Sequence, residues 1–279
     1  MIQPVLRDDA FLADVAAVRA EAPRRLSVWW LGQSGFLVAF AGEFLLFDPY
    51  LSDALTRKYA GTDKPHVRLT ERVVDPARLS GIQLVTSTHT HTDHLDAETL
   101  VPLLRGDVRT RLVLAEANLA FTRQRLGAEW ESRFEVLSPG QTRMIGPFRV
   151  QTVPAAHEEL SDAFVGFVVQ VGPYRIYHSG DTVRYAGMAE RLRDERIDLA
   201  FLPINGRAPE RRVAGNLDGP EAARLAFDAG IRWVVPCHYE MFAFNTAAPD
   251  AFVDGCRKLG QRYAVVRAGE RWELPEPPG

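Results

Sequence analysis

The chain has 279 residues, 46% hydrophobic and 25% charged, a composition typical of a globular protein with a sizeable core, and we expect one domain over residues 1–279. Its formal net charge is −3 and it has no long basic run, which argues against binding to a long nucleic acid. Because it shows no secretory signal, no bilayer-length apolar stretch and only two cysteines, we expect a cytoplasmic protein without a membrane partner or a disulfide framework.

The first part of the chain predicts a helix followed by hairpin strands. Apolar positions at helical spacing place the helix at about residues 8–24. Short apolar runs separated by glycines predict strands at 26–31, 36–40 and 43–47. Residues 52–75 show little periodicity, which predicts an exposed loop able to cover a site. His66 stands alone in this loop, and we expect it in solvent, with a contact of the covering loop as the alternative.

From residue 82 onward, strand and helix patterns alternate. Strands are expected at 82–85, 112–115, 134–137, 148–153, 164–171, 174–178, 199–204, 233–236 and 263–267, and helices at about 97–104, 119–125, 186–193, 220–229 and 249–259. Two stretches of strands, each followed by strand-helix alternation, suggest a duplicated layout. Two sheets packed face to face with helices outside would bury both apolar faces.

A cluster of metal-ligand residue types follows the apolar run at 82–85. It contains His89, His91, Asp93 and His94. In extended backbone, alternate side chains point to the same side, so His89 and His91 can reach one ion together. Asp93 and His94 need a bend, and we expect the chain to turn toward a helix near Asp96. The alternative is a polar loop, but three of only seven histidines fall here, so the cluster predicts a metal site.

Further ligand candidates each end an apolar run: His157, Asp181 and His238. Taken singly, each is explained as a surface histidine or a turn aspartate, whereas together with the cluster they supply missing ligands. Cys237, beside His238, is a candidate ligand or nucleophile, although a small buried apolar role is favoured.

The order of these residues resembles that of the metallo-β-lactamase superfamily: His-x-His-x-Asp-His, a lone His, Ser-Gly-Asp-Thr, and a last His. The resemblance implies an α/β fold, a four-layer αββα sandwich with metals between the sheet edges. It also implies that His89, His91 and His157 hold a first metal. Asp93, His94 and His238 would hold a second, with Asp181 between the two.

Closer motifs resemble the L-ascorbate-6-phosphate lactonase group. They are Trp29-Trp30-Leu31-Gly32, Val74-Asp75-Pro76, Tyr177-His178-Ser179-Gly180-Asp181, Asn205-Gly206-Arg207 and Val234-Val235-Pro236-Cys237-His238. They spread from about residue 29 to 238. The chain departs from the group where Tyr239-Glu240 follow the last histidine in place of His and Asp. The resemblance favours Mn²⁺, whereas an imidazole-rich ligand set also suits Zn²⁺, and either one or two ions are compatible with the pattern.

Two divalent ions sharing a water would hold a hydroxide able to attack a carbonyl or phosphorus centre. Asp181 and Asp93 are the candidate catalytic carboxylates, and Asp181 would orient the hydroxide and pass its proton to the leaving oxygen.

Candidates for contact with the substrate and for support of the ligands come from strand ends and loops. Arg207 is expected to grip a phosphate or carboxylate, with a surface arginine as the alternative. Asn216 is expected in the same pocket, or else in a turn. Asp48 is expected to orient a metal histidine or to cap a turn, and His178 to support or pack beside Asp181.

The leading hypothesis is a metal-dependent hydrolase that uses a metal-bound hydroxide on a small anionic ester or lactone, such as a sugar-acid phosphate lactone. The alternatives are a phosphodiesterase of the same superfamily and a non-catalytic metal-binding domain. The net negative charge argues against a nuclease. A metal-binding domain that had lost its activity should lack some of the ligands, and none of the expected ligands is missing from the sequence. We therefore expect a small anionic substrate as partner, and self-association into a homo-oligomer is left open.

Overall fold

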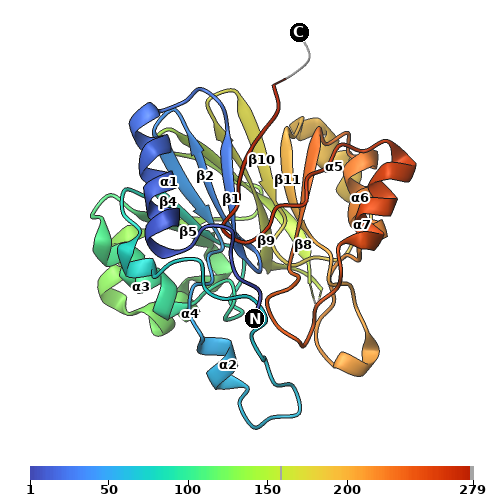
Figure 1. The fold of residues 1–279 in the computed structure, drawn as a ribbon, viewed down its shortest axis with the longest axis horizontal. Coiled ribbons are helices and arrows are strands. Elements are labelled where there is room, and N and C mark those ends of the chain that lie inside the picture. The colour runs from blue at the N-terminus through green and yellow to red at the C-terminus, as the bar shows by residue number, and fades with distance from the viewer. Residues whose placement is uncertain (158, 277–279) are drawn as a thin grey trace.

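The computed structural model describes residues 1–157 and 159–276. Its strands form two sheets that pack face to face, with helices on both outer sides (Figure 1). One sheet consists of β1 (Ser27–Gly32), β2 (Gly35–Phe40), β3 (Glu43–Phe47), β4 (Leu84–Ser87), β5 (Arg111–Ala115), β6 (Phe134–Leu137) and β13 (Arg271–Glu273). The other consists of β7 (Thr142–Ile145), β8 (Phe148–Ala156), β9 (Leu160–Val171), β10 (Tyr174–His178), β11 (Leu199–Pro203) and β12 (Trp233–Cys237).

The strand order confirms the duplicated layout. The first sheet runs β13-β1-β2-β3-β4-β5-β6 and the second β12-β11-β10-β9-β8-β7. In the first, antiparallel β1–β3 are followed by parallel β4–β6; in the second, antiparallel β7–β10 are followed by parallel β11 and β12. The parallel strands therefore end at the same end of each sheet, where their loops can meet.

Helices complete the expected αββα sandwich. They are α1 (Asp8–Glu21), α2 (Ala54–Lys58), α3 (Ala97–Gly106), α4 (Leu119–Leu126), α5 (Met188–Glu195), α6 (Gly219–Asp228) and α7 (Asp250–Leu259). Figure 1 shows α1, α3 and α4 on one outer side and α5, α6 and α7 on the other. No helix among the described residues is long and apolar enough to cross a membrane.

Buried aromatic rings hold the two sheets together. Phe36 of β2 stacks on Phe201 of β11 with ring centroids 3.8 Å apart, and both side chains are fully buried. Phe47 of β3 lies parallel to the ring of His178 from β10, at 5.2 Å. Close contacts of this kind fix the distance between the sheets and hence between the loops at their ends.

The structure corrects three predicted elements and adds two strands. The strand expected at 263–267 is wrong: this segment makes single bridges, from Tyr263 to β12 and from Ala268 to β1, because it crosses between the two sheets. β13 was not predicted, nor was β7, whose partly exposed edge position leaves little apolar pattern. The first helix ends at Glu21 rather than near 24, since Pro23 follows. The expected loop at 52–75 contains the short helix α2.

Candidate metal centre

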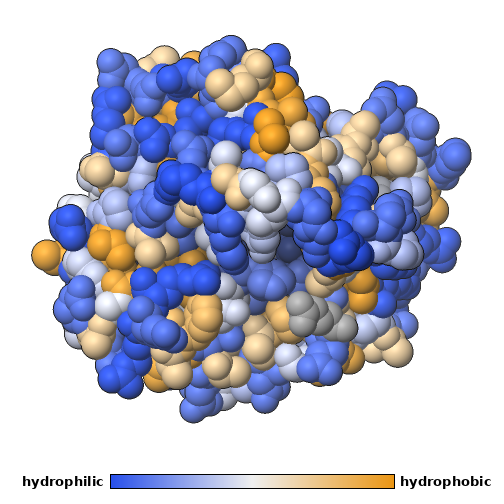
Figure 2. Space-filling model, turned by 90° about the horizontal axis from the view of Figure 1, so that it is seen from below, coloured by the Kyte–Doolittle hydropathy of each residue, from blue (hydrophilic) through white to orange (hydrophobic). Residues whose placement is uncertain are grey.

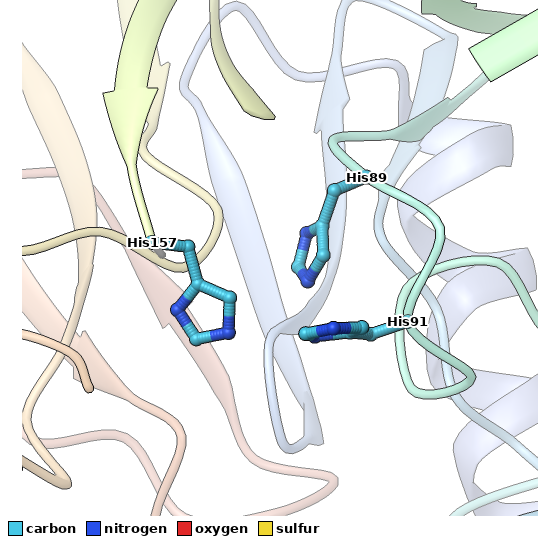
Figure 3. A group of neighbouring side chains, drawn as sticks. All are labelled: His89, His91 and His157. Carbon is cyan, nitrogen blue, oxygen red and sulfur yellow. The ribbon is translucent and has the colours of Figure 1, made fainter. Parts of the chain in front are cut away.

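Loops that follow β4, β8, β10 and β12 meet at one end of the sandwich and bring the predicted ligands together. Their donor atoms form three overlapping sets, each within 4.8 Å. The first group is His89, His91 and His157, the second group is Asp93, His94 and His238, and the third set joins His89 and His94 to Asp181. Figure 3 shows His89 and His91, from the loop after β4, facing His157 from the other sheet. The expected bend is present, because His94 and Leu95 donate backbone hydrogen bonds to the His91 carbonyl and α3 begins at Ala97.

In the first group, hydrogen bonds leave ring nitrogens directed into the site. His157 Nδ1 donates to the Gly215 carbonyl at 3.1 Å, so Nε2, 3.7 Å from Asp181 Oδ2, is left to act as a ligand. His89 Nδ1 lies 3.1 Å from Thr88 Oγ1, and its buried Nε2 has no hydrogen-bond partner among the described residues. Burial lowers the pKa of His89 well below its ordinary value, which keeps the ring neutral and its lone pair available.

In the second group, histidines and carboxylates alternate at short range. His94 Nε2 lies 3.3 Å from Asp181 Oδ1 and 3.7 Å from Asp93 Oδ2, while His238 Nε2 lies 3.2 Å from Asp181 Oδ2. Burial alone would lower the pKa of both histidines, but Asp181 and Asp93 outweigh it, raising the pKa of His238 to about 9 and that of His94 well above its ordinary value. Burial would likewise raise the pKa of both carboxyl groups, yet the histidines hold them well below their ordinary range. A metal ion would take the place of these protons.

The residues fit a divalent metal ion. His89 Nε2, His94 Nε2 and Asp181 Oδ1 are buried, belong to one of the sets above and form no hydrogen bond among the described residues, although His94 Nε2 and Asp181 Oδ1 face each other at 3.3 Å. A buried polar atom without a partner costs about 1–3 kcal/mol, which coordination would recover. Imidazole nitrogen with carboxylate oxygen is a ligand set that suits both Zn²⁺ and Mn²⁺.

Asp48 orients His94 from behind. Its Oδ2 accepts a hydrogen bond from His94 Nδ1 at 2.7 Å and bonds from the Thr88 amide and hydroxyl, while Oδ1 accepts from Thr86 Oγ1 at 2.7 Å. His94 Nε2 thereby faces the site.

The backbone φ is positive at Asp48 (36°), Gln33 (51°) and His238 (61°), so three residues at the site adopt the left-handed conformation that non-glycine residues rarely take.

His178 lies behind Asp181 and belongs to none of the three ligand sets. Its Nε2 donates to the Ser34 carbonyl at 2.8 Å and its Nδ1 accepts from the Gly180 amide at 3.3 Å. Both ring nitrogens are therefore used to hold the turn that presents Asp181. Gly180 has φ +59°, and a Cβ there would lie 2.6 Å from Thr88 Oγ1, so the turn requires glycine. Cys237 is buried in the apolar core, as expected.

The structure does not bring Arg207 or Asn216 to the cavity beside the ligands. Arg207 forms an ion pair with Glu221, with Nη1 at 2.7 Å from Oε2, and donates to the Asn216 carbonyl at 3.1 Å. The buried Asn216 amide donates to Asn205 Oδ1 at 3.0 Å. Both side chains thus stabilise the loop whose Gly215 carbonyl holds His157.

A cavity of about 320 Å³ opens at the ligands. Five predicted ligands line it together with residues that the sequence did not single out as site residues: Gln33, Leu55, Lys58, Tyr59, Lys64, Thr92, Arg212, Val213, Ala214, Phe242, Phe244 and Asn245. Figure 2 shows a recess near the centre of a largely hydrophilic face.

Two lining residues change the expectations. The expectation of a solvated His66 is wrong, because the ring stacks on Tyr59 at 4.4 Å and lines the cavity. Gln33 Nε2 donates a hydrogen bond to Asp93 Oδ2 at 2.8 Å. The backbone carbonyl of Gln33 accepts a hydrogen bond from the backbone amide of His238. Gln33 directly follows the Trp29–Gly32 motif, and this position is the sequence signal that could have identified it as a site residue.

Comparisons with known proteins agree with this geometry. A family model described as a beta-lactamase superfamily domain matches residues 44–239, which contain every predicted ligand. A UPF0173 metal-dependent hydrolase from Rubrobacter xylanophilus is 30% identical over 260 residues, covering 87% of this chain and 94% of that protein. The fold is similar to an isothiocyanate hydrolase from Delia radicum gut bacteria (TM-score 0.69, 17% identity, 88% and 98% of the two chains). It is also similar to a metallo hydrolase from Ignicoccus hospitalis (TM-score 0.65, 20% identity, 91% and 100%).

Proposed function

The chain belongs to the metallo-β-lactamase superfamily and is a metal-dependent hydrolase, and from this premise we propose that it hydrolyses a small anionic ester or lactone. The observation that carries the proposal is the convergence of the two ligand groups at a cavity whose other charged side chains, within the described part of the chain, are cationic. A cavity of about 320 Å³ is of the size that holds a small molecule. We include Mn²⁺ or Zn²⁺ as the metal, and one or two ions, in the proposal.

Divalent ions held by the two groups would supply Lewis-acid chemistry, polarising the scissile group and acidifying water. The protein contributes proton transfer and orientation. Asp93 and Asp181 are the carboxylates among the described residues that line the cavity. Asp181 lies within 3.7 Å of ring nitrogens from both groups, which supports the proposal that it accepts a proton from attacking water and returns it to the leaving oxygen. Gln33 fixes Asp93 through its side-chain amide.

The resemblance to the lactonase group names a sugar-acid phosphate lactone as one substrate to test. Metal-stripped protein would be reloaded with Mn²⁺ or Zn²⁺ and assayed on a lactone and ester panel and on bis(4-nitrophenyl) phosphate. We expect metal-dependent turnover of a lactone or ester. Turnover of the phosphodiester alone would favour a phosphodiesterase, and tight metal binding without any turnover would favour a non-catalytic domain.

Asp181→Asn tests the site itself, with Asp228→Asn as the matched control. Asp228 pairs with Arg184 and Arg224 at the surface, so its loss should leave bound metal and turnover unchanged. Asp181→Asn should lower both the bound metal, measured by elemental analysis, and the turnover. Equal metal content and turnover in the two variants would contradict the assignment of Asp181.

A further inference from the structure

Three cations, which we call the rim cations, line the cavity: Lys58, Lys64 and Arg212. Among the described residues, no carboxylate pairs with either lysine: Lys58 Nζ lies 3.4 Å from Thr92 Oγ1, and Lys64 Nζ donates to the Arg212 carbonyl at 2.6 Å. The carboxylates that line the described cavity both belong to the metal site. The charge of the lysines is therefore available to a ligand.

The rim cations come from two loops that are joined beside the cavity. Lys58 and Lys64 belong to the segment after β3, and Arg212 belongs to the loop after β11; Figure 1 shows both segments projecting from the same end of the sheets. Arg212 pairs with Asp63, and the Lys64 bond to the Arg212 carbonyl adds a second link. The Asp63–Arg212 pair is largely exposed, so water screens the attraction between its two charges. An oxyanion bound between the two loops would add contacts that the loops lack.

The same cavity has an aromatic side formed by four rings, which we call the ring wall: Tyr59, His66, Phe242 and Phe244. His66 stacks on Tyr59, and its ring lies 5.1 Å from Phe242 and 5.3 Å from Phe244. Burial lowers the pKa of His66, so its ring is neutral. These spacings are those of packed aromatic rings, and a flat apolar group can extend such packing.

We propose that the preferred substrate carries a carboxylate or phosphate on a flat apolar body. The oxyanion binds the rim cations, the body packs on the ring wall, and the scissile ester or lactone lies at the ligand groups. This inference rests on the proposed hydrolase function and deepens it. A polyhydroxylated sugar acid satisfies the rim cations but would bury hydroxyl groups against the faces of Phe242 and Phe244, which offer no hydrogen-bond partner, and this disfavours it.

Two matched esters test the role of the anion: 4-acetoxybenzoate and phenyl acetate, which differ by one carboxylate. Water adds its oxygen to the acetyl carbon, the bond from that carbon to the phenolic oxygen breaks, and the phenolic oxygen takes a proton, giving 4-hydroxybenzoate or phenol with acetate. We expect metal-loaded protein to favour the anionic ester by at least about tenfold in kcat/KM. Lys64→Met and Arg212→Met should each lower this preference at least about fivefold. Lys258→Met, at an exposed position in the last turn of α7, should leave it unchanged.

Binding provides a readout independent of turnover. Calorimetry with benzoate and acetate on metal-loaded protein should show tighter binding of benzoate, and Phe244→Ala should lower the ratio of the two affinities. Equal kcat/KM for the two esters, or a preference unaffected by Lys64→Met and Arg212→Met, would overturn the inference while leaving the hydrolase function intact. Benzoate binding that requires Lys64 and Arg212 in a protein that cleaves no ester would support the anion site and refute the proposed function.

Discussion

Replacing Asp48 by asparagine should weaken metal binding by the second group about 10- to 100-fold without unfolding the protein. The buried carboxylate accepts bonds from Thr86, Thr88 and His94, with three donors on Oδ2 and one on Oδ1. An asparagine oxygen can keep the three donors, while its amide faces the Thr86 hydroxyl, which can rotate to accept. Only the Thr86 hydroxyl, which lies on no ligand, loses its acceptor. The loss is the negative charge that makes His94 a stronger ligand, and a factor of 10 to 100 corresponds to about 1.4–2.8 kcal/mol.

Stability gives a second measure of the same change. Asp48→Asn should lower the free energy of unfolding of the metal-free protein by about 1–3 kcal/mol, since charge-assisted hydrogen bonds become neutral ones. Asp48→Ala leaves all the donors unpaired and should cost more, about 3–5 kcal/mol. Urea unfolding measures both, and calorimetry with Mn²⁺ or Zn²⁺ against a competing chelator measures the metal affinity.

The matched control is Asp96→Asn. Asp96 is equally buried and caps α3, accepting from the Glu98 amide and from Thr99 Oγ1, but contacts no histidine. Asparagine is as good a cap as aspartate, so metal affinity should stay near that of the unchanged protein. Wild-type metal affinity in Asp48→Asn would refute the argument that this carboxylate strengthens His94.

Three other changes test the supports of the site. Gly180→Ala should destabilise the protein by about 2 kcal/mol or more in urea unfolding, and Gly187→Ala, with φ +81° and no atom within 4 Å of its Cβ, by only about 1; equal losses would contradict the predicted clash. Arg125→Lys should weaken metal binding in calorimetry, because Arg125 Nη1 donates to the carbonyls of Thr90 and Leu95 that bracket the ligand loop; unchanged affinity would count against this role. Arg207 lowers the pKa of Glu221, so the stability from this pair is present above the ordinary value of 4.5 and is lost as the pH falls through the lowered pKa. Glu221→Gln should therefore cost about 0.5 kcal/mol in urea unfolding at pH 7 and less at pH 3, and a loss independent of pH would contradict the pair's contribution.

Much of the fold could be predicted because its signals are local. Apolar runs and helical spacing depend on neighbouring residues, and they located the strands that end at the ligands, including β4 and β12. The failures lie where pairing is decided at long range. β7 is a half-exposed edge strand with little apolar pattern, and the segment around Tyr263 is apolar but bridges two sheets without joining either.

The sequence by itself determined the types and spacing of the candidate ligands, because each follows a local apolar run that predicts a strand end. Only the tertiary structure decided which side chains face the cavity. Arg207 and Arg212 lie on one loop, yet Arg212 lines the cavity and Arg207 pairs with Glu221. In an irregular loop no periodicity assigns a side chain to a face, so its direction follows from distant partners, such as Asp63 for Arg212.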